Sequence, residues 1–126
     1  MDDSEKLYCF TREEAIELIT QLEILAMNVH LDNIAKGFWL DGSGKGNKAE
    51  KIALMQSELS EALEAIRHNN PPDSHVPDFT SLEVELADVL IRILDFSSSF
   101  KLRIFHAMFA KLRFNEKRQF RHGKEF

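Results

Sequence analysis

The sequence has little cysteine, proline or glycine, and it lacks a long apolar segment. Its 126 residues include one cysteine (Cys9), three prolines and five glycines. A lone cysteine cannot form an internal disulfide, which favours a reducing, cytoplasmic setting. The longest apolar runs, such as 7–10 and 52–55, have four residues, whereas a membrane-spanning helix needs roughly 20. The acidic first residues argue against a secretory signal. We therefore expect a cytoplasmic protein without a membrane segment.

Tryptophan and tyrosine are also scarce, with one each against ten phenylalanines, which indicates an apolar core and not an aromatic binding surface. Hydrophobic residues at 44% and charged residues at 29% are typical of a globular chain, and the length suits a single domain over 1–126. The net charge of −5 is uneven, because 111–126 holds six Lys or Arg and two Glu. That segment therefore carries +4 and leaves −9 for 1–110.

Turn-forming residues interrupt the chain at 41–47, which is rich in glycine, and at 69–78, which holds all three prolines. Around these connections the apolar residues recur at three- and four-residue steps, as they do in helices. Two capping-box patterns, Thr11 with Glu14 and Thr80 with Glu83, predict where two helices begin. We expect helices over about 11–36, 48–68, 80–98 and 103–115. The expected fold is an all-α bundle of about four helices.

Two acidic pairs lie on the second and third of these helices. Glu58 with Glu61, and Glu85 with Asp88, are each three residues apart, so both members of a pair project from one helix face. Two such pairs on antiparallel neighbours would place four carboxylates around one point. Mg²⁺ prefers an oxygen shell of this kind, so the spacing predicts a magnesium site.

A helical wheel separates Glu58 and Glu61 from ordinary surface acids. The main apolar stripe of the second helix holds Ile52, Met55, Leu59, Leu63 and Ile66. The two acids lie in another sector, offset from the polar face, among Leu54, Ala62 and Ala65. Charges in a semi-apolar sector need an ion-pair partner or a metal.

The third helix is apolar over most of its circumference and has one charged stripe. The stripe holds Glu85, Asp88, Arg92 and Asp95. Two interpretations stay open: a solvent-facing window with Arg92 paired to an acid, or part of a metal site. Asp95 itself is either an outer-shell ligand or anchor of a second metal, or a partner for Arg92 or a lysine.

The residues around the acidic pairs resemble a known family. They read Ser57-Glu-Leu-Ser-Glu-Ala-Leu-Glu64 and Glu85-Leu-Ala-Asp-Val-Leu-Ile-Arg92. Upstream are Val29-His30 and Lys36-Gly-Phe-Trp39, and downstream are Lys111-x-x-x-Asn115-x-x-Arg118 and Arg121-His-Gly-Lys124. In order and spacing these motifs are similar to those of the MazG-like all-α nucleoside triphosphate pyrophosphohydrolases.

The resemblance implies an enzyme that cleaves a nucleoside triphosphate between its α and β phosphates, giving the monophosphate and pyrophosphate. The four acids would be the catalytic metal ligands for Mg²⁺, with Mn²⁺ as a substitute. Lys111, Asn115 and Arg118 would lie near the phosphates. The family is usually dimeric or tetrameric, so the resemblance also implies a bundle completed as a homodimer or homotetramer.

Several residues have two open interpretations. His30 and Trp39 either help to form the base pocket, with Trp39 stacking on the base, or serve as packing residues. Lys48 either reaches a phosphate or is an exposed lysine. His122 belongs to the family-like motif, but nothing in the sequence gives it a proton-transfer role.

Two other classes of function are compatible with parts of the sequence. The first is a non-catalytic helical oligomerisation module in which the acids form structural ion pairs. The second is nucleic-acid binding by the basic segment 111–126, which we do not expect because the acidic remainder would repel a long polyanion.

Overall fold

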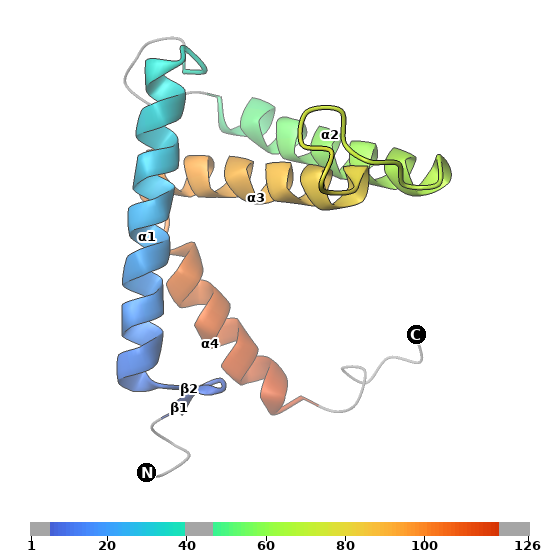
Figure 1. Ribbon diagram of the computed structural model, residues 1–126. Coiled ribbons are helices and arrows are strands. Elements are labelled where there is room, and N and C mark those ends of the chain that lie inside the picture. Colours follow the sequence, from blue (N-terminus) through green and yellow to red (C-terminus); the bar gives the residue numbers. More distant parts are fainter. Residues whose placement is uncertain (1–5, 40–46, 119–126) are drawn as a thin grey trace. The chain divides into compact units, whose positions relative to one another are not determined.

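The computed structural model describes residues 6–39 and 47–118 and contains four helices in these ranges (Figure 1). The helices are α1 (Arg12–Ala35), α2 (Lys48–Arg67), α3 (Ser81–Ser99) and α4 (Ile104–Glu116). A two-stranded hairpin, β1 (Lys6–Leu7) with β2 (Phe10–Thr11), precedes them. The prediction of an all-α fold with about four helices is confirmed, and each predicted helix end lies within one residue of the observed one.

Local capping explains why three of the helices begin where they do. The Thr80 hydroxyl accepts a hydrogen bond from the Glu83 amide, and the Glu83 carboxylate accepts one from the Thr80 amide. Thr11 and Glu14 make the same reciprocal pair at the start of α1. At α2 the Asn47 side chain accepts from the Glu50 amide, a cap that the sequence reasoning did not identify. These bonds satisfy amides that have no partner inside the helix.

The hairpin was not predicted from the sequence. Lys6 pairs with Thr11 and Leu7 with Phe10, and the turn places Tyr8 at a φ of 63°. Strands of two residues are too short to show the alternation that identifies a strand in a sequence, which explains the omission.

The chain divides into two compact units, Met1–Leu25 with Leu102–Phe126, and Ala26–Lys101. In the first unit, Phe10 packs edge-on against Phe109 of α4, with ring centroids 5.7 Å apart. Ala15, Ile19 and Phe105 are also buried in this unit.

The second unit contains α2 and α3, which lie side by side and antiparallel (Figure 1). Their connection is held by backbone and side-chain bonds. Asp73 Oδ2 accepts from the amides of His75 and Val76, and Asn70 Oδ1 accepts from the Leu82 amide. The connection thus fixes the start of α3 relative to the end of α2.

Several charged side chains of α2 and α3 are buried or half-buried, while several of their large apolar side chains are exposed. The charged stripe of α3 lies inward, with Asp95 buried and Glu85, Asp88 and Arg92 half-buried. On α2, Glu58 is only 9% exposed. In contrast, large apolar side chains face outward: Ile52, Leu59, Leu63 and Ile66 on α2, and Leu86, Leu90 and Ile91 on α3.

These exposures decide one interpretation left open by the sequence and locate the apolar stripe of α2. The charged stripe of α3 is not a solvent-facing window, because none of its four residues is exposed. The main apolar stripe of α2 does not face the core, because α2 packs through Glu58, Ala62 and Ala65 instead. Within the described ranges, no helix combines the length and the apolar character that crossing a membrane requires.

Candidate functional site

The acidic pair of α2 meets Glu85 of α3 across the antiparallel helix pair, with Glu58 buried, Glu85 half-buried and Glu61 exposed. Glu58, Glu61 and Glu85 each offer one carboxylate oxygen, and these atoms all lie within 4.8 Å of one another. The two α2 acids project together because they are three residues apart, and Glu85 reaches them from the facing helix. The structure therefore brings three of the four predicted metal ligands together.

Asp88 is the fourth predicted ligand, and it lies three residues after Glu85 on the same face of α3. It is half-buried and lines a cavity that Glu58 also lines. It does not belong to the three-acid cluster defined by the oxygens within 4.8 Å in the described residues. Burial, and then the Glu58 charge, raise the pKa of Asp88. Asp88 thus adds a fourth carboxylate beside the cluster.

The surroundings of Glu85 favour its protonated form. Burial, together with the neighbouring Glu61 and Glu58 carboxylates, raises the pKa of Glu85 to about 7. Its Oε2 atom is buried and accepts no hydrogen bond from any described residue. Burial also acts to raise the pKa of Glu58, but interactions with Glu61, Arg92 and Glu85 outweigh it and hold that pKa below its usual value.

These properties suit a divalent cation. Carboxylate oxygens are the ligands that Mg²⁺ and Mn²⁺ prefer, and three oxygens within 4.8 Å of one another can share one ion. The unpartnered Glu85 oxygen would become a ligand of the cation. The positive charge would also offset the repulsion among the acids. The donor set of Glu58, Glu61 and Glu85, with Asp88 beside it, therefore fits the predicted magnesium.

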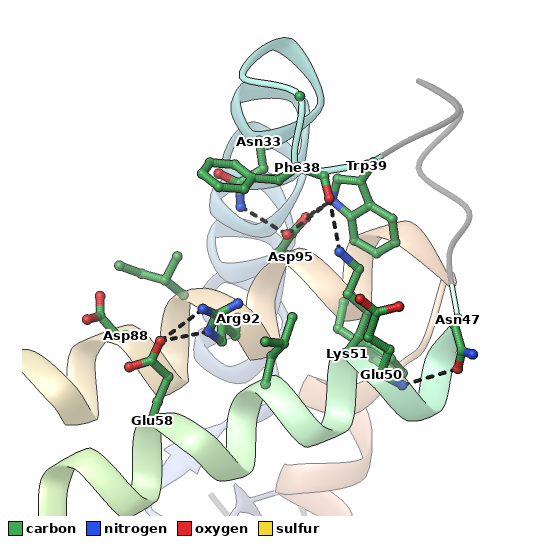
Figure 2. Close-up of a pocket in the computed structure, with 14 residues that line it drawn as sticks. Asn33, Phe38, Trp39, Asn47, Glu50, Lys51, Glu58, Asp88, Arg92 and Asp95 are labelled. Carbon is green, nitrogen blue, oxygen red and sulfur yellow. Dashed lines mark hydrogen bonds and ion pairs between the residues drawn. The ribbon is translucent and has the colours of Figure 1, made fainter.

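A cavity of about 810 Å³ adjoins the acidic cluster. Figure 2 shows that its labelled lining residues come from the end of α1, the following turn, α2 and α3. Its charged and polar lining includes Glu58, Asp88, Arg92, Lys51 and Asn33. A volume in this range holds an organic ligand of a few hundred daltons, such as a nucleotide.

Arg92 is the charged partner of Glu58. Its Nε and Nη2 atoms lie 3.0 and 2.9 Å from the same oxygen, Glu58 Oε1 (Figure 2). The sequence predicted an acidic partner for Arg92 in one interpretation, but it could not identify Glu58, which lies 34 residues earlier.

Asp95 is the centre of a buried hydrogen-bond network. Its carboxylate accepts from Asn33 Nδ2 at 2.9 Å and from Trp39 Nε1 at 3.1 and 3.2 Å, and it lies 2.6 Å from His30 Nδ1. The proposed ion pair of Asp95 with Arg92 or a lysine is therefore wrong. His30 and Trp39, both predicted site residues, are 8% and 3% exposed and also pack edge-on against each other.

Two cavity residues were missed by the sequence reasoning. Asn33 follows His30 by three residues, so their shared helix face was the available signal. Lys51 donates to the Phe38 carbonyl at 3.0 Å and places its ammonium 4.1 Å from the centre of the Trp39 ring (Figure 2). No local pattern distinguishes Lys51 from Lys48, whose ammonium lies over the Phe100 ring.

The basic residues predicted to lie near the phosphates belong to the first unit. Lys111 and Arg118 both lie over the Phe114 ring, at 4.7 and 5.6 Å from its centre. Asn115 Oδ1 is buried and has no hydrogen-bond partner among the described residues. The remainder of the basic motif, 121–124 with His122, lies outside the described residues, as does most of the glycine-rich connection at 41–47.

Comparison with known proteins adds no assignment to this geometry. No family model matches the sequence, and no curated protein or solved structure gives a significant match. The similarity to the MazG-like pyrophosphohydrolases therefore rests on the motifs in the sequence and stays a prediction.

Proposed function

We propose that the protein is a Mg²⁺-dependent nucleoside triphosphate pyrophosphohydrolase. In this reaction one water molecule is consumed as the anhydride bond between the α and β phosphates breaks, and the products are the nucleoside monophosphate and pyrophosphate. The observation that carries the proposal is the convergence of Glu58, Glu61 and Glu85 from two helices beside a cavity that Asp88 also lines.

The burial of Glu58 and the half-burial of Glu85 and Asp88 support a functional role. Burying carboxylates is costly, and here outward-facing leucines and isoleucines accompany inward-facing acids. Sites where local preference is violated in this way are typically functional sites.

The cleavage needs charge neutralisation and positioning more than covalent chemistry. Bound Mg²⁺ would neutralise phosphate charge and polarise the attacking water. Glu58, Glu61, Glu85 and Asp88 would hold the ion, and a carboxylate among them would accept the proton of the water. By resemblance, Lys111, Asn115 and Arg118 would contact phosphates. Trp39 lines the cavity and would shape its base end, whereas His30 does not line it and would act through Asp95.

The outward apolar faces support a homo-oligomer, in keeping with the predicted homodimer or homotetramer. Leu90 and Ile66 are 62% and 57% exposed, and they belong to faces that carry several exposed apolar side chains each. Apolar patches of this kind mark protein–protein contacts. A second copy of the chain would bury them.

The alternative is a non-catalytic oligomerisation module, and the ion pair between Arg92 and Glu58 favours it. In that case the acids would be structural, and the cluster would bind neither a metal nor a nucleotide. Glu85 weighs against this alternative, because burial and the neighbouring Glu61 and Glu58 raise its pKa, and its Oε2 atom has no hydrogen-bond partner among the described residues.

The test is pyrophosphate release from a panel of ribo- and deoxyribonucleoside triphosphates with Mg²⁺. We expect monophosphate and pyrophosphate in equal amounts, and a loss of at least about 100-fold in kcat/KM for Glu61→Gln, since a metal ligand is lost. Glu64→Gln is the matched control, because Glu64 is an exposed acid of the same helix, like Glu61, but pairs with Arg67 and does not belong to the three-acid cluster. Well-folded protein that is inactive on the whole panel would refute the proposal.

A further inference from the structure

We propose that Arg92 is a displaceable counter-ion: it holds Glu58 in the metal-free protein and turns to the triphosphate when a divalent cation takes Glu58. The inference rests on the proposed function and deepens it, because it assigns Arg92 a substrate contact. Neither the acidic motifs nor the basic segment gives Arg92 this role.

The geometry of the ion pair makes exchange feasible. Both guanidinium donors converge on Oε1 of Glu58, and Glu58 also contributes an oxygen to the three-acid cluster. The Glu58 side chain is 12% exposed, whereas the Arg92 side chain is 38% exposed. Glu58 is thus enclosed by the helix pair, while the Arg92 side chain is partly exposed and has room to adopt another rotamer once its bonds to Glu58 are released.

The position of Arg92 directs that movement into the cavity. Arg92 lies one turn after Asp88 on α3, and both residues line the cavity together with Glu58 (Figure 2). A guanidinium that leaves Glu58 therefore stays within a space bordered by the predicted metal ligands. Arginine binds phosphate oxygens with two parallel donors, so a triphosphate is a suitable new partner.

The charge balance of the cavity gives the exchange a reason. Its acidic lining, Glu50, Glu58, Asp88 and Asp95, outnumbers its basic lining, Lys51 and Arg92. A polyanionic ligand needs cations in this space, and Lys51 is held by the Phe38 carbonyl and the Trp39 ring. Once a divalent cation binds Glu58, Arg92 loses its acidic partner. Arg92 can then pair with a phosphate of the ligand.

Two binding measurements on Arg92→Gln test the inference. Calorimetric titration with Mn²⁺ alone should show roughly tenfold tighter binding than in wild type, because the competing positive charge is removed. Titration of the Mn²⁺-saturated protein with an α,β-imido nucleoside triphosphate should show binding about tenfold weaker or more. Arg67→Gln is the matched control, since Arg67 pairs with Glu64 at 2.7 Å outside the cavity, and it should change neither affinity.

The opposite signs of the two changes distinguish exchange from a fixed structural ion pair. Mn²⁺ affinity that does not increase, or analogue affinity that does not decrease, would overturn the inference. If Arg92→Gln does not fold, Arg92→Lys replaces it. That variant keeps the charge but offers a single ammonium group, so we expect at least a threefold loss of analogue affinity, and wild-type affinity would overturn the inference.

Failure of the inference can be separated from failure of the proposed function. If wild-type protein binds neither Mn²⁺ nor the analogue, the proposed function fails and the inference fails with it. If wild-type protein binds both and Arg92→Gln binds them equally well, only the role of Arg92 is refuted.

Discussion

The buried network around Asp95 gives the sharpest stability prediction. Replacing Asp95 with alanine removes the acceptor shared by His30, Asn33 and Trp39. His30 and Trp39 are buried, so water cannot readily replace the lost carboxylate. The three residues come from the end of α1 and the turn that follows it, and they fix that segment against α3.

The size of the effect follows from the three donors. Each buried donor left without an acceptor costs about 1–3 kcal/mol, and the three effects are not fully additive because they share one partner. We expect Asp95→Ala to lower the free energy of unfolding by about 4 kcal/mol. Asp95→Asn keeps the shape but loses the charge, and we expect about 2 kcal/mol.

Urea unfolding followed by tryptophan fluorescence and circular dichroism measures these changes. Trp39 is the single tryptophan of the chain and a member of the network, so its fluorescence reports the network directly. Asp32→Ala is the matched control: Asp32 pairs with Lys36 at 2.7 Å on the exposed surface of α1. An exposed pair of this kind contributes about 0.3–0.5 kcal/mol. Equal effects of Asp95→Ala and Asp32→Ala would refute the reasoning.

Three further predictions concern the capping box, the acidic cluster and the outward apolar faces. Thr80→Ala should cost about 1 kcal/mol of unfolding free energy, because the Thr80 hydroxyl caps α3; urea unfolding measures this, and no change would contradict it. Metal-free protein should lose stability as pH rises from 4.5 to about 7, because folded Glu85 keeps its proton over this window while the unfolded chain releases it. Thermal unfolding in EDTA should show this loss in wild type and a smaller one in Glu85→Gln, in which Asp88 keeps a raised pKa, and equal pH profiles would contradict the assignment. Leu63→Glu should convert an oligomer to a monomer in size-exclusion chromatography with light scattering, since Leu63 is an outward apolar residue of α2, and unchanged mass would exclude that face from the contact.

The helices were predictable because their signals are local. Thr80 and Glu83 lie three residues apart and define the start of α3 in the sequence as they do in the structure. The acidic pair Glu58 and Glu61 was recognisable for the same reason, since its wheel position depends only on helix geometry. The sequence could therefore predict that both helices present acids on a defined sector.

The partners of those acids were not predictable, because they come from distant parts of the chain. Asp95 meets Trp39 and His30 across 56 and 65 residues, and Arg92 meets Glu58 across 34. The exposure of the apolar stripe of α2 was not predictable either. A helix whose larger apolar face is exposed in one copy of the chain cannot be distinguished, by periodicity alone, from a helix that packs on its own core.

Binding of Mn²⁺ to the acidic cluster is the most direct test of the account. Calorimetric titration at pH 8 should show binding to wild type, equal binding to Glu64→Gln, and at least tenfold weaker binding to Glu61→Gln, because a cluster ligand is lost only in the last variant. Equal affinities in all three proteins, or no binding to well-folded wild type, would contradict the assignment of Glu58, Glu61 and Glu85 as a metal site.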